Sequence, residues 1–346
     1  MDWIELVAAL VLILASAELF TNALEWIGES FGLTEGAVGS VLAAVGTALP
    51  ETLLPLVAIA VGGAHAGEEV GIGAILGAPL MLTTLAMFVL GVATLMFARN
   101  GARSTRITGD RRVLLQDLGY FLAMYVLAVA AGLFHHVWFK RALAVFLLVG
   151  YAFYVYRHFK TPGEQTEDRE ATGEELGPLR LGRILRRSQG RGVEWETPPN
   201  WASVTQAVIA LLGIVAGARV FVIGIDAVAK AFGVPELVLA LLIAPLATEL
   251  PEKFNSVLWV KRRKDTLALG NITGAMVFQS SFPVTVGLLL TSWRLTGDGL
   301  VAAMVALVAG AILWTTIKVK GSLGAQLLLF QGALYGGYVV YVLSRI

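Results

Sequence analysis

Long apolar segments separated by short polar loops make up most of the chain. Segments of about 20 apolar residues can cross the roughly 30 Å hydrocarbon core of a bilayer as helices. Ten such spans are predicted, at residues 3–24, 37–62, 70–98, 114–134, 138–157, 203–229, 235–260, 267–291, 299–317 and 323–343. The pattern predicts an all-α polytopic membrane protein with ten transmembrane helices in two five-helix halves.

The interval between the two halves has a different character. Residues 158–200 hold eight acidic residues, a run of arginines ending at Arg191, and Pro198-Pro199. Such a composition is typical of a flexible or partly helical linker that is solvated rather than folded into a core. The predicted organisation is a first five-helix repeat at 1–157, a cytoplasmic linker at 158–200 and a second repeat at 201–346.

Basic residues are distributed unequally between the predicted loops. Most of them fall in the loops around Arg99–Arg112 and Lys261–Lys264 and in the linker, which all lie on one side of the membrane. The positive-inside rule makes that side cytoplasmic and places both termini outside, in a prokaryotic-type plasma membrane. Because each half has five helices, the second half enters the membrane in the opposite sense. The sequence therefore predicts an inverted repeat.

Composition narrows the functional classes. With 57% hydrophobic and 15% charged residues over 346 positions, the chain is too apolar for a soluble domain, and its first expected partner is the lipid bilayer. The absence of cysteine excludes disulfides and thiol catalysis. The basic linker is nearer to anionic lipid headgroups than to nucleic acid, so no nucleic-acid partner is expected.

A short motif occurs twice inside apolar segments. Thr47–Glu51 reads Thr-Ala-Leu-Pro-Glu, and Thr248–Glu252 reads Thr-Glu-Leu-Pro-Glu at an offset of 201. Proline interrupts helical hydrogen bonding, and an intramembrane carboxylate is costly without a partner. Freed carbonyls, hydroxyls and carboxylates are the hard oxygen ligands suited to Na⁺ or Ca²⁺. Each copy is therefore predicted to break its helix and contribute to an ion site.

A second motif pair follows each copy. Gly73–Ala78 corresponds to Gly270–Ala275 at an offset of 197. Both copies keep a Gly-x-x-x-Gly spacing, which lets two helix backbones approach closely. The two motif pairs together cover corresponding parts of both halves, as a duplicated unit requires.

These motifs resemble the alpha repeats of the sodium/calcium exchanger (cation/Ca²⁺ antiporter) superfamily. The resemblance covers the ten-helix plan, the central loop and both repeats. It implies a secondary antiporter rather than an enzyme, with no cofactor and with Na⁺, Ca²⁺ or H⁺ as the transported cations. It also implies that two motif glutamates bind the cation at the midplane, while the first and sixth helices move against the second, third, seventh and eighth. The candidate cation ligands are Glu51, Glu252, Thr47, Thr248, Glu249, Gln279 and Asn271.

The chain departs from the family pattern mainly in its first half. Ala48, Ala74 and Ala78 stand where the family carries Ser, Asn and Ser. In the second half Asn271 is kept, and Glu249 adds a third carboxylate. The predicted site is therefore asymmetric, with its polar groups concentrated in the second half.

Two interpretations of these substitutions remain open. In one, Glu249 and Gln279 rebuild a cation site of different selectivity. In the other, Lys253 pairs with Glu249 and Arg219 pairs with the carboxylates, so that exchange is lost and the fold serves as a sensor or scaffold. The first is favoured because proton relays commonly use buried carboxylates.

Other charged and titratable side chains carry weaker expectations. Arg219 corresponds to Glu18 at the offset of 201, so these two side chains are expected to pair. An intramembrane enzyme acting on lipid would need a nucleophile or a metal cluster, and the sequence offers neither clearly. The histidines are expected to be interfacial because they fall near predicted helix ends, at positions 65, 135, 136 and 158. The sequence does not specify an oligomeric state.

Overall fold

The structure is a computed structural model that describes residues 2–30, 43–99, 103–134, 136–160, 178–181, 198–295 and 297–345. Its first half contains α1 (Asp2–Ser30), α3 (Ala43–Val61), a π-helical turn (Gly63–Gly67), α4 (Glu68–Met81), a second π-helical turn (Leu82–Ala86), α5 (Met87–Ala98), α6 (Arg111–Leu133) and α7 (Val137–Lys160). Its second half contains α10 (Asn200–Phe232), α11 (Glu236–Thr248), α12 (Leu250–Lys261), α13 (Asp265–Gln279), α14 (Phe282–Leu290), α15 (Gly297–Lys320) and α16 (Ala325–Leu343). Two short strands, β1 (Arg106–Ile107) and β2 (Leu323–Gly324), pair antiparallel.

Within the described residues, eight helical segments are long and apolar enough to cross a membrane. They are Ile4–Leu24, His65–Ala98, Arg111–Leu133, Val137–Arg157, Asn200–Phe232, Asp265–Leu290, Gly297–Lys320 and Ala325–Leu343. They correspond to eight of the ten predicted spans. The remaining two, 37–62 and 235–260, carry the Pro-Glu motifs and contain only shorter apolar helices, Glu51–Ala60 and Glu236–Leu246. Residues 37–42 lie outside the described part of the chain.

The Pro-Glu motifs adopt two different backbone structures. In the first copy α3 continues through Pro50, so the predicted break there is wrong. In the second copy α11 ends at Thr248 and α12 begins at Leu250, with Pro251 in its first turn, so the predicted break is confirmed. Pro251 lacks the N–H that would continue the α11 hydrogen-bond ladder.

The predicted spans that come after the two motifs, 70–98 and 267–291, also differ from each other in backbone structure. Segment 70–98 is continuous but contains the π-helical turn after α4, where the Thr83 hydroxyl donates to the Pro79 carbonyl at 2.7 Å. Side-chain bonds of this kind compete with the helical ladder and distort it locally. Segment 267–291 is interrupted at Ser280 and Ser281 between α13 and α14.

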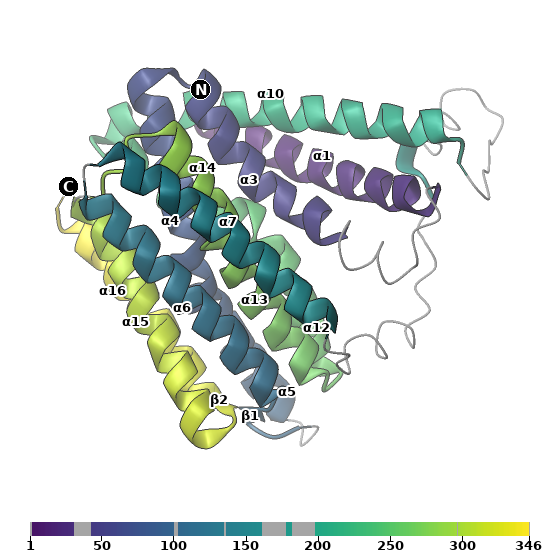
Figure 1. Cartoon of the computed structure of the whole chain (residues 1–346), viewed down its shortest axis with the longest axis vertical. Helices are drawn as coiled ribbons and strands as arrows, with labels where there is room; N and C mark the ends of the chain where they lie inside the picture. Colours follow the sequence, from purple (N-terminus) through teal and green to yellow (C-terminus); the bar gives the residue numbers. More distant parts are fainter. Residues whose placement is uncertain are drawn as a thin grey trace.

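Two helices stand apart from the main bundle. In Figure 1, α1 and α10 run side by side across the top of the view, and α6, α7 and α15 run obliquely below them. Glycine allows this close pairing, because a Cβ added to Gly217 of α10 would lie 2.7 Å from Cγ1 of Ile13 on α1. A separate apolar cluster joins α1 and α10 to α3, α4 and α11 through residues such as Leu6, Leu54 and Phe221.

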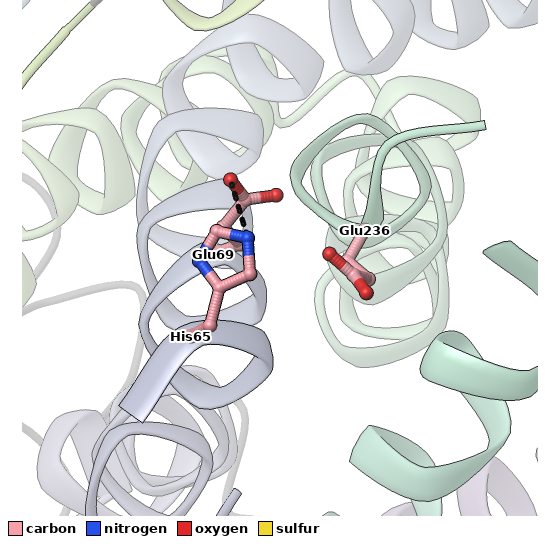
Figure 2. Close-up of side chains that lie close together, drawn as sticks. All are labelled: His65, Glu69 and Glu236. Carbon is pink, nitrogen blue, oxygen red and sulfur yellow. Dashed lines mark ion pairs between the residues drawn. The ribbon is translucent and has the colours of Figure 1, made fainter. Parts of the chain in front are cut away.

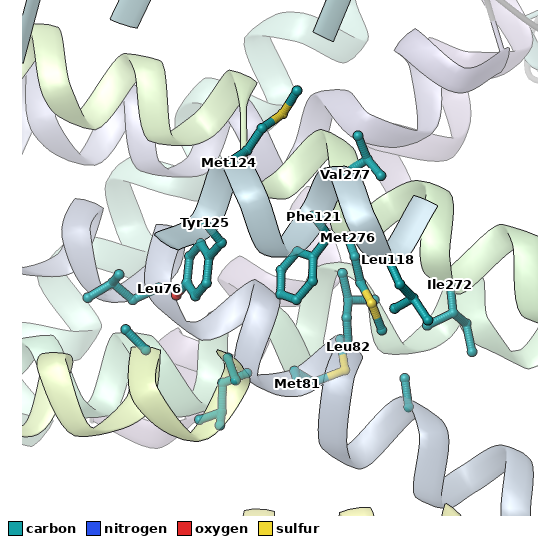
Figure 3. Packing of buried hydrophobic residues seen from close by; sticks show 14 of the residues in the cluster. Leu76, Met81, Leu82, Leu118, Phe121, Met124, Tyr125, Ile272, Met276 and Val277 are labelled. Atoms are coloured by element: carbon teal, nitrogen blue, oxygen red, sulfur yellow. The ribbon is translucent and has the colours of Figure 1, made fainter. Parts of the chain in front are cut away.

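The larger core holds the bundle together. Leu76 of α4, Phe121 and Tyr125 of α6 and Met276 of α13 belong to one buried cluster, and Figure 3 shows Leu76 beside Tyr125. The Phe121 and Tyr125 rings stack with centroids 5.5 Å apart. Since α4, α6 and α13 share these buried side chains, they form one packed body that does not include α1.

A short described piece of the linker is anchored rather than solvated. Leu179 is buried against Trp26 of α1 and Ala202 of α10. Arg180 forms an ion pair with Glu18 at 2.6 Å. The predicted pairing of Glu18 with Arg219 is therefore wrong, and Arg219 is exposed on α10. Linker residues 161–177 and 182–197 lie outside the described part of the chain.

Candidate cation site

A small cavity lies where α3, α4 and α11 meet. Its volume is about 10 Å³, the room that one water molecule or one unhydrated small ion needs. Its lining consists of Glu51, Leu54, Pro55, Ala74, Ala78, Ala244, Pro245, Thr248 and Glu249. The cavity therefore brings residues of both Pro-Glu copies together.

Close contact between α4 and α11 fixes two walls of the cavity. A Cβ added to Gly77 would lie 2.1 Å from the Leu241 carbonyl oxygen, and one added to Gly73 would lie 2.4 Å from that of Leu237. The Gly-x-x-x-Gly spacing of the first copy thus allows two helix backbones to approach closely, as predicted. In the second copy a Cβ on Gly274 would meet nothing within 4 Å, so tight packing is not its role there.

Two carboxylates line the cavity from different halves of the chain. Glu51 comes from α3 and is half-buried, while Glu249 sits at the break after α11 and is 1% exposed. Thr248 is also buried, and its hydroxyl donates to the Ala244 carbonyl at 3.1 Å. Two carboxylates in a space for one ion repel each other unless a proton or a cation neutralises them.

A buried lysine follows one turn later. The Lys253 side chain is 4% exposed, and its backbone N–H donates to the Glu249 carbonyl at 3.3 Å. Lys253 thus lies one helical turn after Glu249, as their i,i+4 spacing predicted. Arg219, the other cation proposed to neutralise the site, is exposed on α10, so that part of the second interpretation is wrong.

The described lining of the cavity does not include the other predicted ligands, Thr47, Glu252, Asn271 and Gln279. Thr47 is on α3 and Glu252 is on α12, but their side chains lie outside the described residues. Asn271 of α13 donates to the Ser256 hydroxyl of α12 at 3.0 Å. Gln279 is the buried last residue of α13. The described lining of the cavity includes neither α13 residue.

One buried carboxylate was missed by the sequence analysis. Asp117 of α6 is 1% exposed and accepts hydrogen bonds from the Tyr154 hydroxyl at 2.9 Å and the Thr273 hydroxyl at 2.6 Å. Thr273 lies within the second Gly-x-x-x-Gly motif, so this bond ties α13 to α6. An aspartate inside predicted span 114–134 is the signal that could have found it.

Spanning helices around a carboxylate-lined cavity at a broken helix define a polytopic membrane protein of the secondary-transporter class. The chain belongs to the sodium/calcium exchanger protein family, which it matches over residues 2–160 and 202–346. It is thus an integral membrane protein with an exchanger-family antiporter fold. Members of this family are transporters rather than enzymes. The predicted class is confirmed.

Two curated relatives extend over most of the chain. The inner membrane protein YrbG of Escherichia coli strain K12 is 25% identical over 349 residues, covering 99% of this chain and 97% of the relative. The putative antiporter CaxA of Alkalimonas amylolytica is 25% identical over 289 residues, covering 81% of this chain and 78% of the relative.

Solved structures share the fold. The crystal structure of the H⁺/Ca²⁺ exchanger CAX superposes with a TM-score of 0.68 at 15% identity, covering 99% of this chain and 82% of that one. The sodium-calcium exchanger NCX_Mj superposes with a TM-score of 0.53 at 20% identity, covering 98% and 97%. At these identities the likeness shows the fold alone.

Proposed function

We propose that the protein is a secondary active cation antiporter that works by alternating access, with Glu51 and Glu249 binding the exchanged ions. The observation that carries this proposal is the one-ion cavity that both carboxylates line. In hydrocarbon, a pair of carboxylates marks an ion or proton pathway by default. Thr47, Thr248, Glu252, Asn271 and Gln279 remain predicted ligands of the same ion pathway.

The donor set favours a proton as one of the exchanged ions. Ca²⁺ takes about 6–8 oxygen ligands, whereas the α4 wall presents Ala74 and Ala78 and supplies no side-chain oxygen from these positions. A carboxylate alone is enough to carry a proton. When one cavity carboxylate loses its proton, one Na⁺ balances its charge, and when both do, one Ca²⁺ balances the two charges. This competition between protons and the cation couples the two fluxes.

The moving part in this proposal is the α1–α10 pair. These helices pack tightly on each other, and their apolar cluster includes residues of α3, α4 and α11 but none of α6 or α13. Sliding of the pair would open the cavity to alternate sides. The proposal keeps the inverted five-helix repeats at 1–157 and 201–346, with the linker cytoplasmic and both termini outside.

Transport in proteoliposomes tests the proposal. Purified protein is reconstituted, a pH gradient is imposed, and ²²Na⁺ or ⁴⁵Ca²⁺ uptake is followed together with internal pH. Glu51→Gln and Glu249→Gln are each expected to reduce exchange to the level of protein-free liposomes. Asp298→Asn is the matched control, since Asp298 is a carboxylate at the start of α15, away from the cavity. Full exchange in both cavity variants would contradict the proposed role of the carboxylates. No flux in the wild-type protein would favour the sensor or scaffold alternative.

A further inference from the structure

An imidazole and two carboxylates converge at one end of the α4–α11 pair. His65 lies in the π-helical turn before α4, Glu69 in the first turn of α4, and Glu236 is the first residue of α11. One ligand atom from each lies within 4.8 Å of the other two. Figure 2 shows His65 and Glu69 on one helix with Glu236 facing them from the next, and His65 Nε2 is 3.9 Å from Glu69 Oε1.

The arrangement follows from helix geometry and close packing. His65 and Glu69 are four residues apart, so they share one face, and Gly73 and Gly77 continue that face at the same interval. Gly73 lies against the carbonyl of Leu237, the residue next to Glu236. The glycine contacts therefore hold Glu236 opposite His65 and Glu69.

A further carboxylate, which is paired with a lysine, lies beside this end. Glu236 also interacts with Asp226 of α10 as well as with Glu69. The Asp226 carboxylate accepts a hydrogen bond from the Lys230 ammonium at 2.7 Å, and the Lys230 side chain is largely exposed. Three carboxylates that approach one another in this way repel, and a shared cation or proton relieves that repulsion.

We propose that His65, Glu69 and Glu236 form a binding site for a divalent cation of the Zn²⁺ class, separate from the central cavity. Imidazole suits Zn²⁺, Ni²⁺ and Cu²⁺, whereas Ca²⁺ and Mg²⁺ take oxygen ligands only. Zinc binds nitrogen and carboxylate oxygen at roughly 2.0–2.2 Å, so the ligands need only a small side-chain rotation to close around it. Water completes the coordination sphere.

The proposed zinc site and the transport cavity are chemically distinct. The zinc site has one nitrogen donor and lies where α4 and α11 begin, whereas the described polar lining of the cavity is oxygen only. Zinc binding by His65, Glu69 and Glu236 goes beyond the transport function and does not depend on it.

Calorimetry with the full-length purified protein tests the proposed zinc site. Zn²⁺ is titrated in the presence of excess Ca²⁺ and Mg²⁺. His65→Ala and Glu236→Gln are each expected to weaken binding at least about 10-fold, since losing even an outer-shell partner costs roughly that much. His136→Ala is the matched control, because His136 is also exposed but stands outside the cluster.

Each result of the Zn²⁺ titration either supports the proposed site or overturns it. Weaker binding in His65→Ala and Glu236→Gln but not in His136→Ala supports the site. Absent binding in the wild-type protein, unchanged binding in His65→Ala and Glu236→Gln, or equal loss in His136→Ala overturns it. Glu51→Gln is expected to bind Zn²⁺ normally, so failure of the transport proposal and failure of this one are distinguishable. Unchanged elution on size-exclusion chromatography checks that each variant is folded.

Discussion

The two Pro-Glu copies share a sequence but not a structure. In the first copy α3 runs through Pro50, and in the second the helix is broken at Glu249 between α11 and α12. At the offset of 201, Ala44 and Ala48 stand where the second copy has Pro245 and Glu249. Alanine is the strongest helix former, so Ala44 and Ala48 favour a continuous helix in the first copy, whereas Pro245 removes one hydrogen bond from α11 without ending it.

The difference shows how two copies of one motif can contribute differently to a single cavity. The continuous copy contributes Glu51 from within a helix and presents small side chains from α4. The second copy contributes Thr248 and Glu249 at the junction of α11 and α12, where the Glu249 N–H donates to the Pro245 carbonyl at 3.0 Å and the Glu249 carbonyl accepts from the Lys253 N–H at 3.3 Å. The two copies of the motif thus meet at one cavity and supply it with different groups.

Replacing the shared proline in each copy is expected to separate the two roles most strongly. Pro251→Ala restores an N–H and favours a single α11–α12 helix by about 3 kcal/mol, roughly a 100-fold shift toward the unbroken form. Glu249 would then leave the cavity, and exchange in proteoliposomes is expected to be lost. Pro50→Ala changes a helix that is already continuous, so it is expected to retain most of the exchange rate. Equal loss in both variants would show that the break at Glu249 has no special role.

The sequence predicted the parts of this comparison that depend on local pattern. Span positions follow from the length of apolar runs, and eight of the ten predicted spans correspond to spanning helices in the described residues. Whether Pro50 or Pro251 breaks its helix depends on the tertiary contacts as well as on the residues beside it. Periodicity alone therefore could not decide it.

Contacts between distant helices were the hardest part to predict. Asp117 was overlooked because its partners, Tyr154 and Thr273, come from two other helices. His65 was interpreted as interfacial because it falls near a predicted helix end, and its proximity to Glu236 depends on the packing of α4 on α11. The hydrogen bond from the Asn271 amide to the Ser256 hydroxyl likewise joins two helices, and no local rule indicates it.

The glycines of the second motif pair offer a smaller test of the same asymmetry. Gly77→Ala places a methyl group 2.1 Å from the Leu241 carbonyl and is expected to lower the free energy of unfolding by about 1–3 kcal/mol. Gly274→Ala meets nothing within 4 Å and is expected to be neutral or stabilising by up to about 1 kcal/mol. Unfolding in detergent micelles by titration with SDS measures both. Destabilisation by Gly274→Ala equal to that of Gly77→Ala would contradict the different roles assigned to the two motifs.

The smallest expected effect concerns how each copy is attached to the bundle. At the offset of 197, Leu76 of α4 corresponds to Thr273 of α13, so an apolar contact in the first copy is replaced by a hydrogen bond to Asp117 in the second. Thr273→Val keeps the shape but removes the donor, and is expected to cost about 1 kcal/mol, as interhelical hydrogen bonds in membranes typically do. Thr94→Val is the matched control, because the buried Thr94 hydroxyl donates at 2.7 Å to Leu90 of its own helix. The same SDS titration compares them, and a cost for Thr94→Val as large as for Thr273→Val would mean that the bond to Asp117 does not anchor α13.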